Sequence, residues 1–166
     1  MKDTLPLPDE EEQADLYLLA VQILEALGYR QYEISNFAIP SYESRHNTLY
    51  WHCGEYLGLG PSAHSFYRGR RFYYPRDFRQ FDANAVVQDG EGGGEEEYIL
   101  LALRLREGLV FSSFRRRFQK PVSPRMLQKI RRYAQTGFME LDADHAYFTP
   151  KGFLVSNTII SDLLSP

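Results

Sequence analysis

The 166-residue sequence contains a single cysteine, Cys53. One thiol cannot form an internal disulfide, and such sparing use of cysteine is typical of a reducing compartment. The sequence also lacks the closely spaced cysteines that hold an iron–sulfur cluster, so this chain cannot bind one through the usual thiolates. No apolar run approaches the 18 residues that a membrane helix needs.

The N-terminus is acidic and contains proline, which is unlike a signal peptide or a transit peptide. Together with the low cysteine content, this leads us to expect a cytoplasmic protein, or an organelle-matrix protein whose leader is missing.

Acidic residues are absent from one long stretch. Between residues 108 and 139 there is no Asp or Glu, against eight Lys and Arg, whereas residues 9–15 and 89–97 are acidic. The net charge of −3 implies no partner by itself, but this uneven distribution makes the basic stretch a candidate binding face. The alternative interpretation is a pair of solvated helix faces.

The N-terminal part is predicted to be a helix that leads into a strand. Asp9 and Glu12 have the spacing of a capping box, and the alternation at residues 32–35 is typical of a short strand. Apolar residues at helical spacing precede a glycine stop: Leu16, Leu19, Ala20, Ile23 and Leu27, then Gly28.

A lone strand is not stable, so the strand at 32–35 must pair with others. We expect it to belong to a larger α/β domain of which this chain is the tail. If the chain is whole, the strand should instead pair with residues 56–59 or with a later hairpin.

A loop at 40–44 is expected to lead into one helical turn at 46–51. Residues four apart lie on the same face of a helix, so this turn places His46 beside Tyr50 and Asn47 beside Trp51. Residues 56–60 have the pattern of a short buried strand that enters a tight turn.

Aromatic residues alternate with arginine from 65 to 74, around Gly69. This pattern predicts a β-hairpin with a basic face. A short helix is expected within 77–87. Residues 89–94 are polar and rich in glycine, and they are expected to be a linker.

The last 72 residues are predicted to be a small, mainly helical domain with a winged-helix-like order of elements. The expected elements are a helix at 95–106, a helix capped by Ser112 or Ser113, a helix from Pro124 to Gly137, a hairpin within 138–149, and a helix from Pro150 to Leu164.

His46 is the first candidate for a functional residue, because neutral imidazole is a good axial ligand of haem iron. Tyr50, Trp51 and Phe37 offer flat surfaces for a macrocycle. Arginines suited to paired hydrogen bonds with propionates are Arg45, Arg68, Arg70 and Arg71. The alternative is a histidine that only caps a local turn.

Two other patterns carry weaker hypotheses. His52 and Cys53 are too few ligands for structural zinc, and a buried free thiol is the simpler interpretation. Residues 58–63 match the letters of a dinucleotide fingerprint, but Pro61 removes an amide and no helix is expected to follow. We therefore reject a dinucleotide site, and His64 after it is interpreted as structural. We find no catalytic residues.

Five strings carry a family resemblance. The sequence resembles the C-terminal portion of the oxygen-independent coproporphyrinogen III oxidase-like radical S-adenosylmethionine proteins, especially their haem chaperone (HemW-like) branch. The strings are YEISNFA at 32–38, RHNTLYW at 45–51, EYLGLGPSAHSF at 55–66, LRLREG at 103–108 and FTPKG at 148–152.

The resemblance implies a mixed α+β or α/β fragment: the last strand–helix part of an incomplete (β/α)6 barrel, then a small helical, winged-helix-like domain. The implied divisions are 1–88 for the barrel part and 95–166 for the helical domain. The linker at 89–94 joins them. The family's three-cysteine cluster motif is absent from this chain, so the chain alone is not expected to be an enzyme.

The resemblance also implies site residues. It assigns haem binding to His46, Asn47, Tyr50 and Trp51, with His46 as the metal ligand. It places Gly60, Ala63 and His64 near the S-adenosylmethionine pocket of the parent protein, which would also hold a [4Fe–4S] cluster.

The function implied by the resemblance is that of a haem chaperone that delivers haem to an acceptor protein. The alternative is an oxidase that decarboxylates coproporphyrinogen III. A third hypothesis, from the basic stretch alone, is a nucleic-acid-binding winged helix, which the acidic residues Asp142 and Asp144 in the hairpin turn disfavour. A homodimer that shields exposed barrel edges is a further possibility.

Overall fold

The computed structural model describes residues 7–166, and its first helix begins at the predicted capping box. In α1 (Glu10–Ala26) the Asp9 carboxylate accepts the Glu12 amide at 2.9 Å, and the Glu12 carboxylate accepts the Asp9 amide at 3.0 Å. Gly28 follows with φ of 87°, which confirms the predicted stop. Residues 1–6 of the predicted barrel part lie outside the described residues.

The apolar stripe of α1 is largely uncovered in this chain. Leu16, Leu19, Ile23 and Leu27 are each at least 50% exposed, and Val21 is the buried residue of the helix. The packing expected from the helical spacing is therefore not made by residues 7–166.

The strand predicted at 32–35 ends at Glu33 and forms a hairpin with the segment that follows it. β1 (Arg30–Glu33) pairs antiparallel with β2 (Asn36–Ala38), so the expected pairing with 56–59 or with a later hairpin is wrong. The reason is local, because a turn at Ile34–Ser35 lets the chain fold back at once.

The buried face of β1 is polar. Gln31 and Glu33 are buried, while Tyr32 is only half-buried. The Gln31 side-chain amide donates to the Tyr17 hydroxyl at 2.6 Å, and the Glu33 carboxylate accepts from the Ser35 amide at 3.1 Å. The Gln31 side-chain oxygen has no partner among residues 7–166, so these bonds compensate only in part for the loss of water around the polar groups.

The β1–β2 hairpin docks on the C-terminal part of the chain. The Ile34 amide donates to the Arg104 carbonyl at 3.1 Å, and the Arg106 amide donates to the Tyr32 carbonyl at 3.0 Å. An isolated bridge joins Glu33 to Leu105. The hairpin thereby gains a neighbouring strand-like segment from 70 residues further along the chain.

A short helix, α2 (Arg45–Trp51), follows as predicted. The strand expected at 56–60 is absent, since only Tyr56 pairs, with Phe66, and Leu59 is 93% exposed. Gly58 lies so close to the next strand that a side-chain carbon there would meet the His64 carbonyl oxygen at 2.1 Å. The segment is an open turn held at its two ends.

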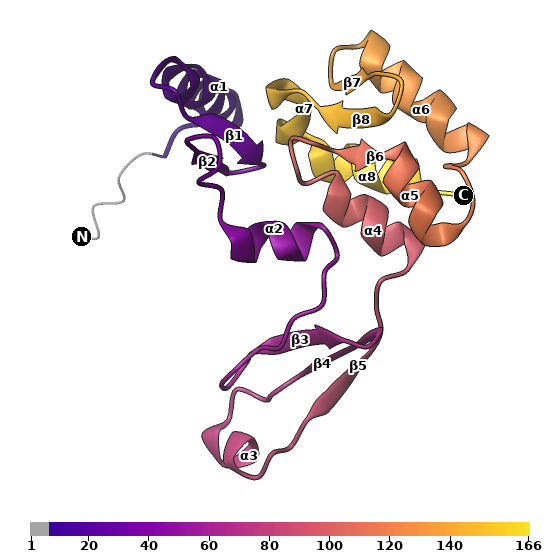
Figure 1. Cartoon of the computed structure of the whole chain (residues 1–166). Helices are drawn as coiled ribbons and strands as arrows, with labels where there is room; N and C mark the ends of the chain where they lie inside the picture. The colour runs from indigo at the N-terminus through magenta and orange to yellow at the C-terminus, as the bar shows by residue number, and fades with distance from the viewer. Residues whose placement is uncertain (1–6) are drawn as a thin grey trace.

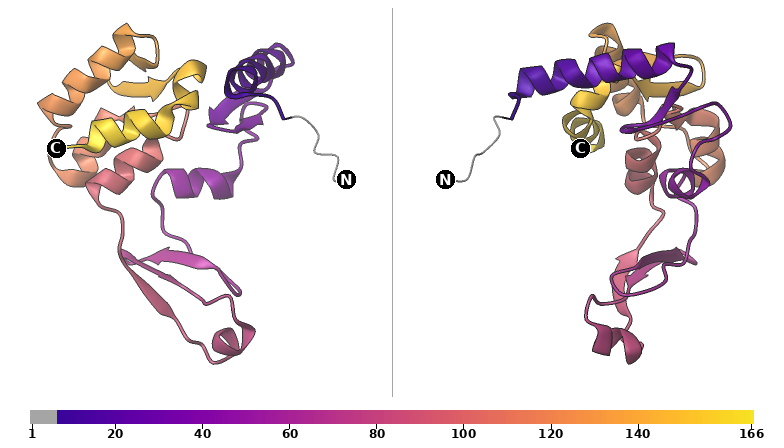
Figure 2. Two further views of the ribbon diagram at one scale, coloured as in Figure 1. Left: turned by 180° about the vertical axis from the view of Figure 1, so that it is seen from behind. Right: turned by 90° about the vertical axis from the view of Figure 1, so that its left-hand side faces the viewer.

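The predicted hairpin at 65–74 is confirmed and gains a third strand. β3 (His64–Tyr67) pairs with β4 (Arg70–Tyr73) around Arg68 and Gly69, both with positive φ. β4 also pairs with β5 (Val87–Glu91), and α3 (Phe78–Asp82) lies between them in sequence. We call residues 64–91 the arm. It projects away from the rest of the molecule (Figures 1 and 2).

Strand β5 changes the interpretation of residues 89–94. The first three of them belong to the strand, and only Gly92–Gly94 connect it to the next helix. The polar composition of β5 is explained by its position, because every residue of this edge strand is exposed.

The C-terminal part packs helices around a three-stranded sheet with the order β6-β8-β7. We call residues 95–166 the helical domain. Its elements are α4 (Glu95–Ala102), β6 (Leu109–Val110), α5 (Phe111–Phe118), α6 (Pro124–Gln135), β7 (Met139–Leu141), β8 (His145–Phe148), α7 (Pro150–Leu154) and α8 (Ser156–Leu164). Its core is centred on Leu103, Leu109, Ile130, Ala146 and Phe148, which are fully buried.

Three boundaries differ from those expected in the helical domain. α4 ends at Ala102 rather than near 106, and the last helix divides at Val155. α5 begins at Phe111, so the predicted serine caps are wrong. The Asp144 carboxylate instead accepts from the Ser112 amide at 2.8 Å and from its hydroxyl at 2.6 Å. The cap therefore comes from the hairpin turn, 32 residues away.

Arg71 connects the arm to the helical domain. Its guanidinium forms an ion pair with Glu97 of α4, donates to the Tyr56 hydroxyl at 3.3 Å, and lies 4.8 Å from the centre of the Phe66 ring. Gly92 packs on the same ring, since a side-chain carbon there would lie 2.8 Å from Phe66. We call Tyr56, Phe66, Arg71, Gly92 and Glu97 the joint.

His52, just after α2, ties this helix to the helical domain. Its Nε2 lies 3.0 Å from a carboxylate oxygen of Glu107, and its Nδ1 lies 2.8 Å from the Thr48 carbonyl. The hydrogen bond to Glu107 raises the pKa of His52, and the same bond lowers the pKa of Glu107.

None of the helices formed by the described residues is both long enough and apolar enough to cross a membrane.

The first prediction concerns the joint. In Arg71→Met the Glu97 carboxylate loses its ion pair while it stays largely buried, so we expect the free energy of unfolding to fall by about 1 to 2 kcal/mol. Urea denaturation measures this. The matched control is Arg70→Met on the same strand, where the side chain is exposed and the change should stay within about 0.5 kcal/mol. Equal effects of the two substitutions would contradict the role of the joint.

The second prediction concerns pH. A raised pKa of His52 stabilises the fold below the ordinary histidine value of 6.5, and this stabilisation is lost as pH rises through the folded pKa. A lowered pKa of Glu107 stabilises the fold above 4.5, and this is lost as pH falls through the folded pKa. The pair therefore contributes most between those two values. Its share is below about 1 kcal/mol, because both side chains are about half exposed.

Glu107→Gln tests this pair. We expect its loss of stability relative to the parent to be larger near pH 5.5 than near pH 8.5, and NMR titration should show a lower pKa for His52. In a His52→Gln background, Glu107→Gln should lose its pH dependence. An unchanged His52 titration would show that the contact is not formed in solution.

Candidate functional site

Helix α2 carries the residues that the sequence analysis singled out first. Ser44 caps it, since its hydroxyl accepts the Asn47 amide at 3.3 Å, and the Thr48 hydroxyl donates to the Ser44 carbonyl at 3.0 Å. The helix ends at His52, and Cys53 follows with φ of 54°. Local capping thus defines a short helix whose faces follow from the spacing of its residues.

His46 and Tyr50 lie together on one face of α2, as predicted from their spacing. Their ring centres are 4.6 Å apart, with an interplanar angle of 84°. Tyr50 in turn meets Tyr56 edge-on at 4.2 Å. The three rings form a row from the exposed face of the helix toward the joint.

The imidazole of His46 is exposed, and within residues 7–166 no hydrogen bond or ion pair to it is found. Desolvation raises the pKa of Tyr50, and the neighbouring Tyr56 raises it further. Asn47 and Trp51, four residues apart, are half-buried on the adjoining face of the helix. All four predicted haem-binding residues therefore lie within the short helix α2.

The other groups near α2 that can bind metals are engaged elsewhere. Both ring nitrogens of His52 have partners, as described above. The Cys53 thiol is buried beside the Arg117 guanidinium, with Sγ 3.7 Å from Nη2, and burial raises its pKa. His52 and Cys53 therefore do not form a ligand pair.

The arginines proposed for propionate groups separate in the structure. Arg71 is committed to the joint. Arg68 and Arg70 lie at the β3–β4 turn, at the end of the arm next to the connector, since the Gly92 amide donates to the Gly69 carbonyl at 2.9 Å and Arg70 pairs with Glu91. Arg68 covers the Tyr67 ring at 5.2 Å. Arg45 is exposed next to His46 as the first residue of α2. Of the four arginines, Arg45 alone shares an element with the candidate ligand.

Gly60, Ala63 and His64 lie at the start of the arm. Gly60 has φ of 107°, and its carbonyl accepts the Ala63 amide at 3.1 Å, which closes a tight turn. His64 stacks on Tyr73, with ring centres 4.9 Å apart. A strand follows this turn, so the rejection of a dinucleotide site is supported by the geometry.

Donor clusters for a resident metal are not present in the part of the chain that the structure describes. Residues 7–166 contain no group of three or more His, Cys, Asp or Glu side chains that could hold a metal ion. With one buried cysteine, the chain does not fit a cluster held by several thiolates.

Sequence reasoning missed the residues that hold α2 in place. Glu107 and Arg117 lie 55 and 64 positions from their partners His52 and Cys53. The ion pair between Arg71 and Glu97 was also unforeseen. No local pattern marks any of these contacts, so covariation between such positions would be the signal to seek.

Comparisons with known proteins agree with the resemblance. Residues 96–155 match the HemN C-terminal domain family. The chain is 30% identical over 168 residues to the protein named heme chaperone HemW from Lactococcus lactis, covering 96% of this chain and 44% of the relative. It is 30% identical over 171 residues to Escherichia coli HemW, with the same coverage.

A shorter match has a higher sequence identity. Over 61 residues the chain is 51% identical to the mouse mitochondrial radical S-adenosyl methionine domain-containing protein 1, covering 37% of this chain and 14% of that protein. The chain spans less than half the length of the HemW relatives.

The fold has a solved counterpart. The structure of coproporphyrinogen III oxidase (HemN) from Escherichia coli, described as a radical SAM enzyme, matches with a TM-score of 0.67 at 18% identity. It covers 95% of this chain and 42% of that one, so the mixed α/β fold agrees with that part of HemN. The chain therefore contains a match to the HemN C-terminal domain family at residues 96–155, and as a whole it is similar to part of proteins named heme chaperone HemW.

Proposed function

We propose that this chain contributes the haem contact of a haem chaperone, and that His46 is the axial ligand of the haem iron. One observation carries the proposal. His46 is the histidine of α2 whose ring is exposed and without a partner among residues 7–166, whereas His52 is held at both nitrogens. The similarity to proteins named heme chaperone HemW supports it.

The neighbours of His46 suit a porphyrin. The edge of Tyr50 limits rotation of the imidazole, so less conformational entropy is lost when a ring nitrogen binds iron. Trp51 and Asn47 on the adjoining face supply a flat apolar surface and a polar side chain for the macrocycle. Arg45 supplies a guanidinium that can bind a propionate with two hydrogen bonds.

The family's two cofactors, S-adenosylmethionine and a [4Fe–4S] cluster, differ in how well the residues of this chain suit them. Gly60, Ala63 and His64 remain a proposal for the edge of an S-adenosylmethionine pocket, supported by the tight turn that exposes backbone groups there. The residues of this chain do not fit a [4Fe–4S] cluster, because it has one cysteine and that cysteine is buried. We therefore propose that this chain binds haem as cargo and does not itself make or break covalent bonds.

A chaperone requires a protein that accepts its haem, and we propose such an acceptor as the partner, with the cytoplasm as the compartment. The alternative function, oxidation of coproporphyrinogen III, has the fold of HemN in its favour, at 18% identity. For the fold, we propose that residues 7–88 are the end of a radical SAM barrel and that the helical domain is a winged helix.

The third prediction tests the ligand. Haemin titration of the 166-residue chain should give a saturable shift of the Soret band, and His46→Ala should weaken binding at least about tenfold, or about 1.4 kcal/mol. Because His46 is exposed, the substitution should leave the urea midpoint unchanged.

His64→Ala is the matched control, since it removes another exposed histidine, which lies in the arm. It should bind haem as the parent chain does. A shift that survives His46→Ala and is lost in His64→Ala would move the ligand to the arm. No saturable shift in any of the three proteins would remove the haem site from this chain.

A further inference from the structure

The outward face of α6 is a continuous basic and amide-bearing surface. It surrounds a shallow hollow of about 530 Å³. The residues that line the hollow are Arg125, Gln128, Lys129, Arg131, Arg132 and Gln135, all from α6. At 100° per residue they occupy one side of the helix, and the side contains neither an acidic nor an apolar residue.

The opposite side of α6 is buried in the helical domain. Ile130 is fully buried, and Met126, Leu127 and Tyr133 pack against the core. The helix is therefore fixed by its apolar side, and its polar side faces outward.

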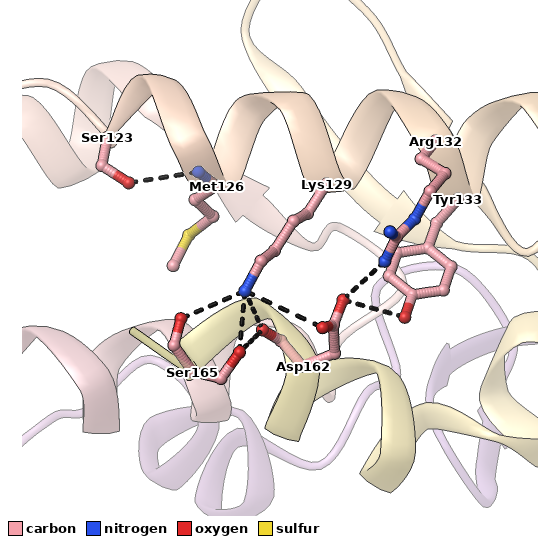
Figure 3. A network of polar contacts seen from close by, with 7 residues as sticks. All are labelled: Ser123, Met126, Lys129, Arg132, Tyr133, Asp162 and Ser165. Carbon is pink, nitrogen blue, oxygen red and sulfur yellow. Dashed lines mark hydrogen bonds and ion pairs between the residues drawn. The ribbon is translucent and has the colours of Figure 1, made fainter.

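Contacts with α8 hold one edge of this surface (Figure 3). The Lys129 ammonium donates to the carbonyls of Asp162 and Ser165 at 2.5 and 3.1 Å, so it caps the end of α8. The Asp162 carboxylate accepts from Arg132 at 2.9 Å and from the Tyr133 hydroxyl at 3.0 Å. These bonds use Lys129 and partly use Arg132, and they leave Arg125 and Arg131 exposed on a rigid helix.

The topology gives α6 a particular position. The order α4, β6, α5, α6, β7, β8, with the sheet order β6-β8-β7, is that of a winged helix-turn-helix. α5 and α6 are joined by a turn at 119–123 in which Gln119 has φ of 56°. The second helix of such a pair is the one that enters the major groove of DNA in known complexes.

The chemistry of the surface also favours nucleic acid. Arginine forms paired hydrogen bonds with guanine or with phosphate, and glutamine does so with adenine. A membrane-binding helix would need apolar side chains on its outward face, and α6 has none there. Residues 95–166 carry eleven Lys and Arg against eight acids, although the whole chain is acidic.

Arg115 of α5 extends the basic surface. It lines a second hollow together with Leu127, near the start of α6. Its exposed guanidinium is therefore placed to contact a phosphate beside a groove that α6 occupies.

The acidic hairpin turn counts against contact with nucleic acid at that turn, because hydrogen bonds lower the pKa of its carboxylates and keep them charged. Asp144 caps α5 through Ser112, and Asp142 accepts from the amides of Asp144 and His145. They stabilise the turn that joins β7 to β8. Contact would therefore be made by α6 and α5, without the hairpin.

We propose that the helical domain binds double-stranded DNA, with α6 in the major groove, Arg125 and Arg131 as the main contacts, and Arg115 on the backbone. This surface lies on other elements than His46, so it stands or fails independently of haem binding.

The fourth prediction is tested by fluorescence anisotropy with the full chain and a labelled DNA duplex of about two helical turns. Three phosphate-neutralising side chains predict a slope of log K against log salt of about −2.7, so affinity should fall by about 40-fold between 50 and 200 mM NaCl. Arg125→Glu combined with Arg131→Glu should weaken binding at 50 mM NaCl by at least about 30-fold.

The matched control is Arg76→Glu combined with Arg79→Glu, which makes the same charge change on exposed residues of the arm. It should keep the parent affinity within about twofold, since charges more than a Debye length from the duplex are screened. Circular dichroism and urea midpoints check that both variants are folded.

Three outcomes would overturn the proposal: no binding to duplex at 50 mM NaCl, equal losses in the two double variants, or binding to vesicles of phosphatidylglycerol and phosphatidylcholine without binding to duplex. The last outcome would assign the same surface to an anionic membrane.

Discussion

The ion pair between Arg71 and Glu97 is the contact on which the arrangement of this chain depends. The arm and the helical domain each contain their own sheet, and only Gly92–Gly94 connect them directly. A glycine connector has little stiffness of its own, so side-chain contacts must set the geometry. Arg71 provides them by joining Glu97 of α4, the Phe66 ring of the arm and the Tyr56 hydroxyl. Because Tyr56 also meets Tyr50, the same guanidinium supports the row of rings that ends at His46.

The two histidines of the α2 region differ in their contacts. His52 holds the end of the helix in place, since its ring contacts Glu107 through one nitrogen and the Thr48 carbonyl through the other. His46 lies on the outward face with no partner among residues 7–166. A helix fixed at its C-terminal end by His52 and the buried Cys53 can present a free imidazole with little motion, which lowers the entropic cost of binding a flat ligand. The function proposed for this chain therefore depends on the long-range contacts of α2 as well as on its sequence.

Local signals in the sequence predicted local structure well. The capping box at Asp9, the hairpin around Gly69 and the proline start of α6 each depend on neighbours within a few residues, and each is confirmed. Helical spacing also predicted that His46 lies beside Tyr50, whereas the haem role of these residues came from the family resemblance. Apart from the local β1–β2 hairpin, the errors concern contacts between distant residues. The Gln31 side chain of β1 donates to Tyr17, the backbone of the hairpin bonds to the segment at 104–106, and the polar strand β5 exists because β4 offers it an edge. None of these partners is visible in the pattern of the strand itself.

The central claim is that His46, and no other histidine of this chain, meets the porphyrin metal. The four histidines give four ring signals in a chain labelled with ¹⁵N-histidine, and zinc protoporphyrin is a diamagnetic ligand that accepts one imidazole. Titration followed by long-range ¹H–¹⁵N spectra should shift a coordinated ring nitrogen of His46 and leave the ring nitrogens of His52, His64 and His145 in place. A shift of the His52 or His64 ring nitrogens with an unchanged His46 would contradict the account, because the ligand would then be His52 or a histidine of the arm.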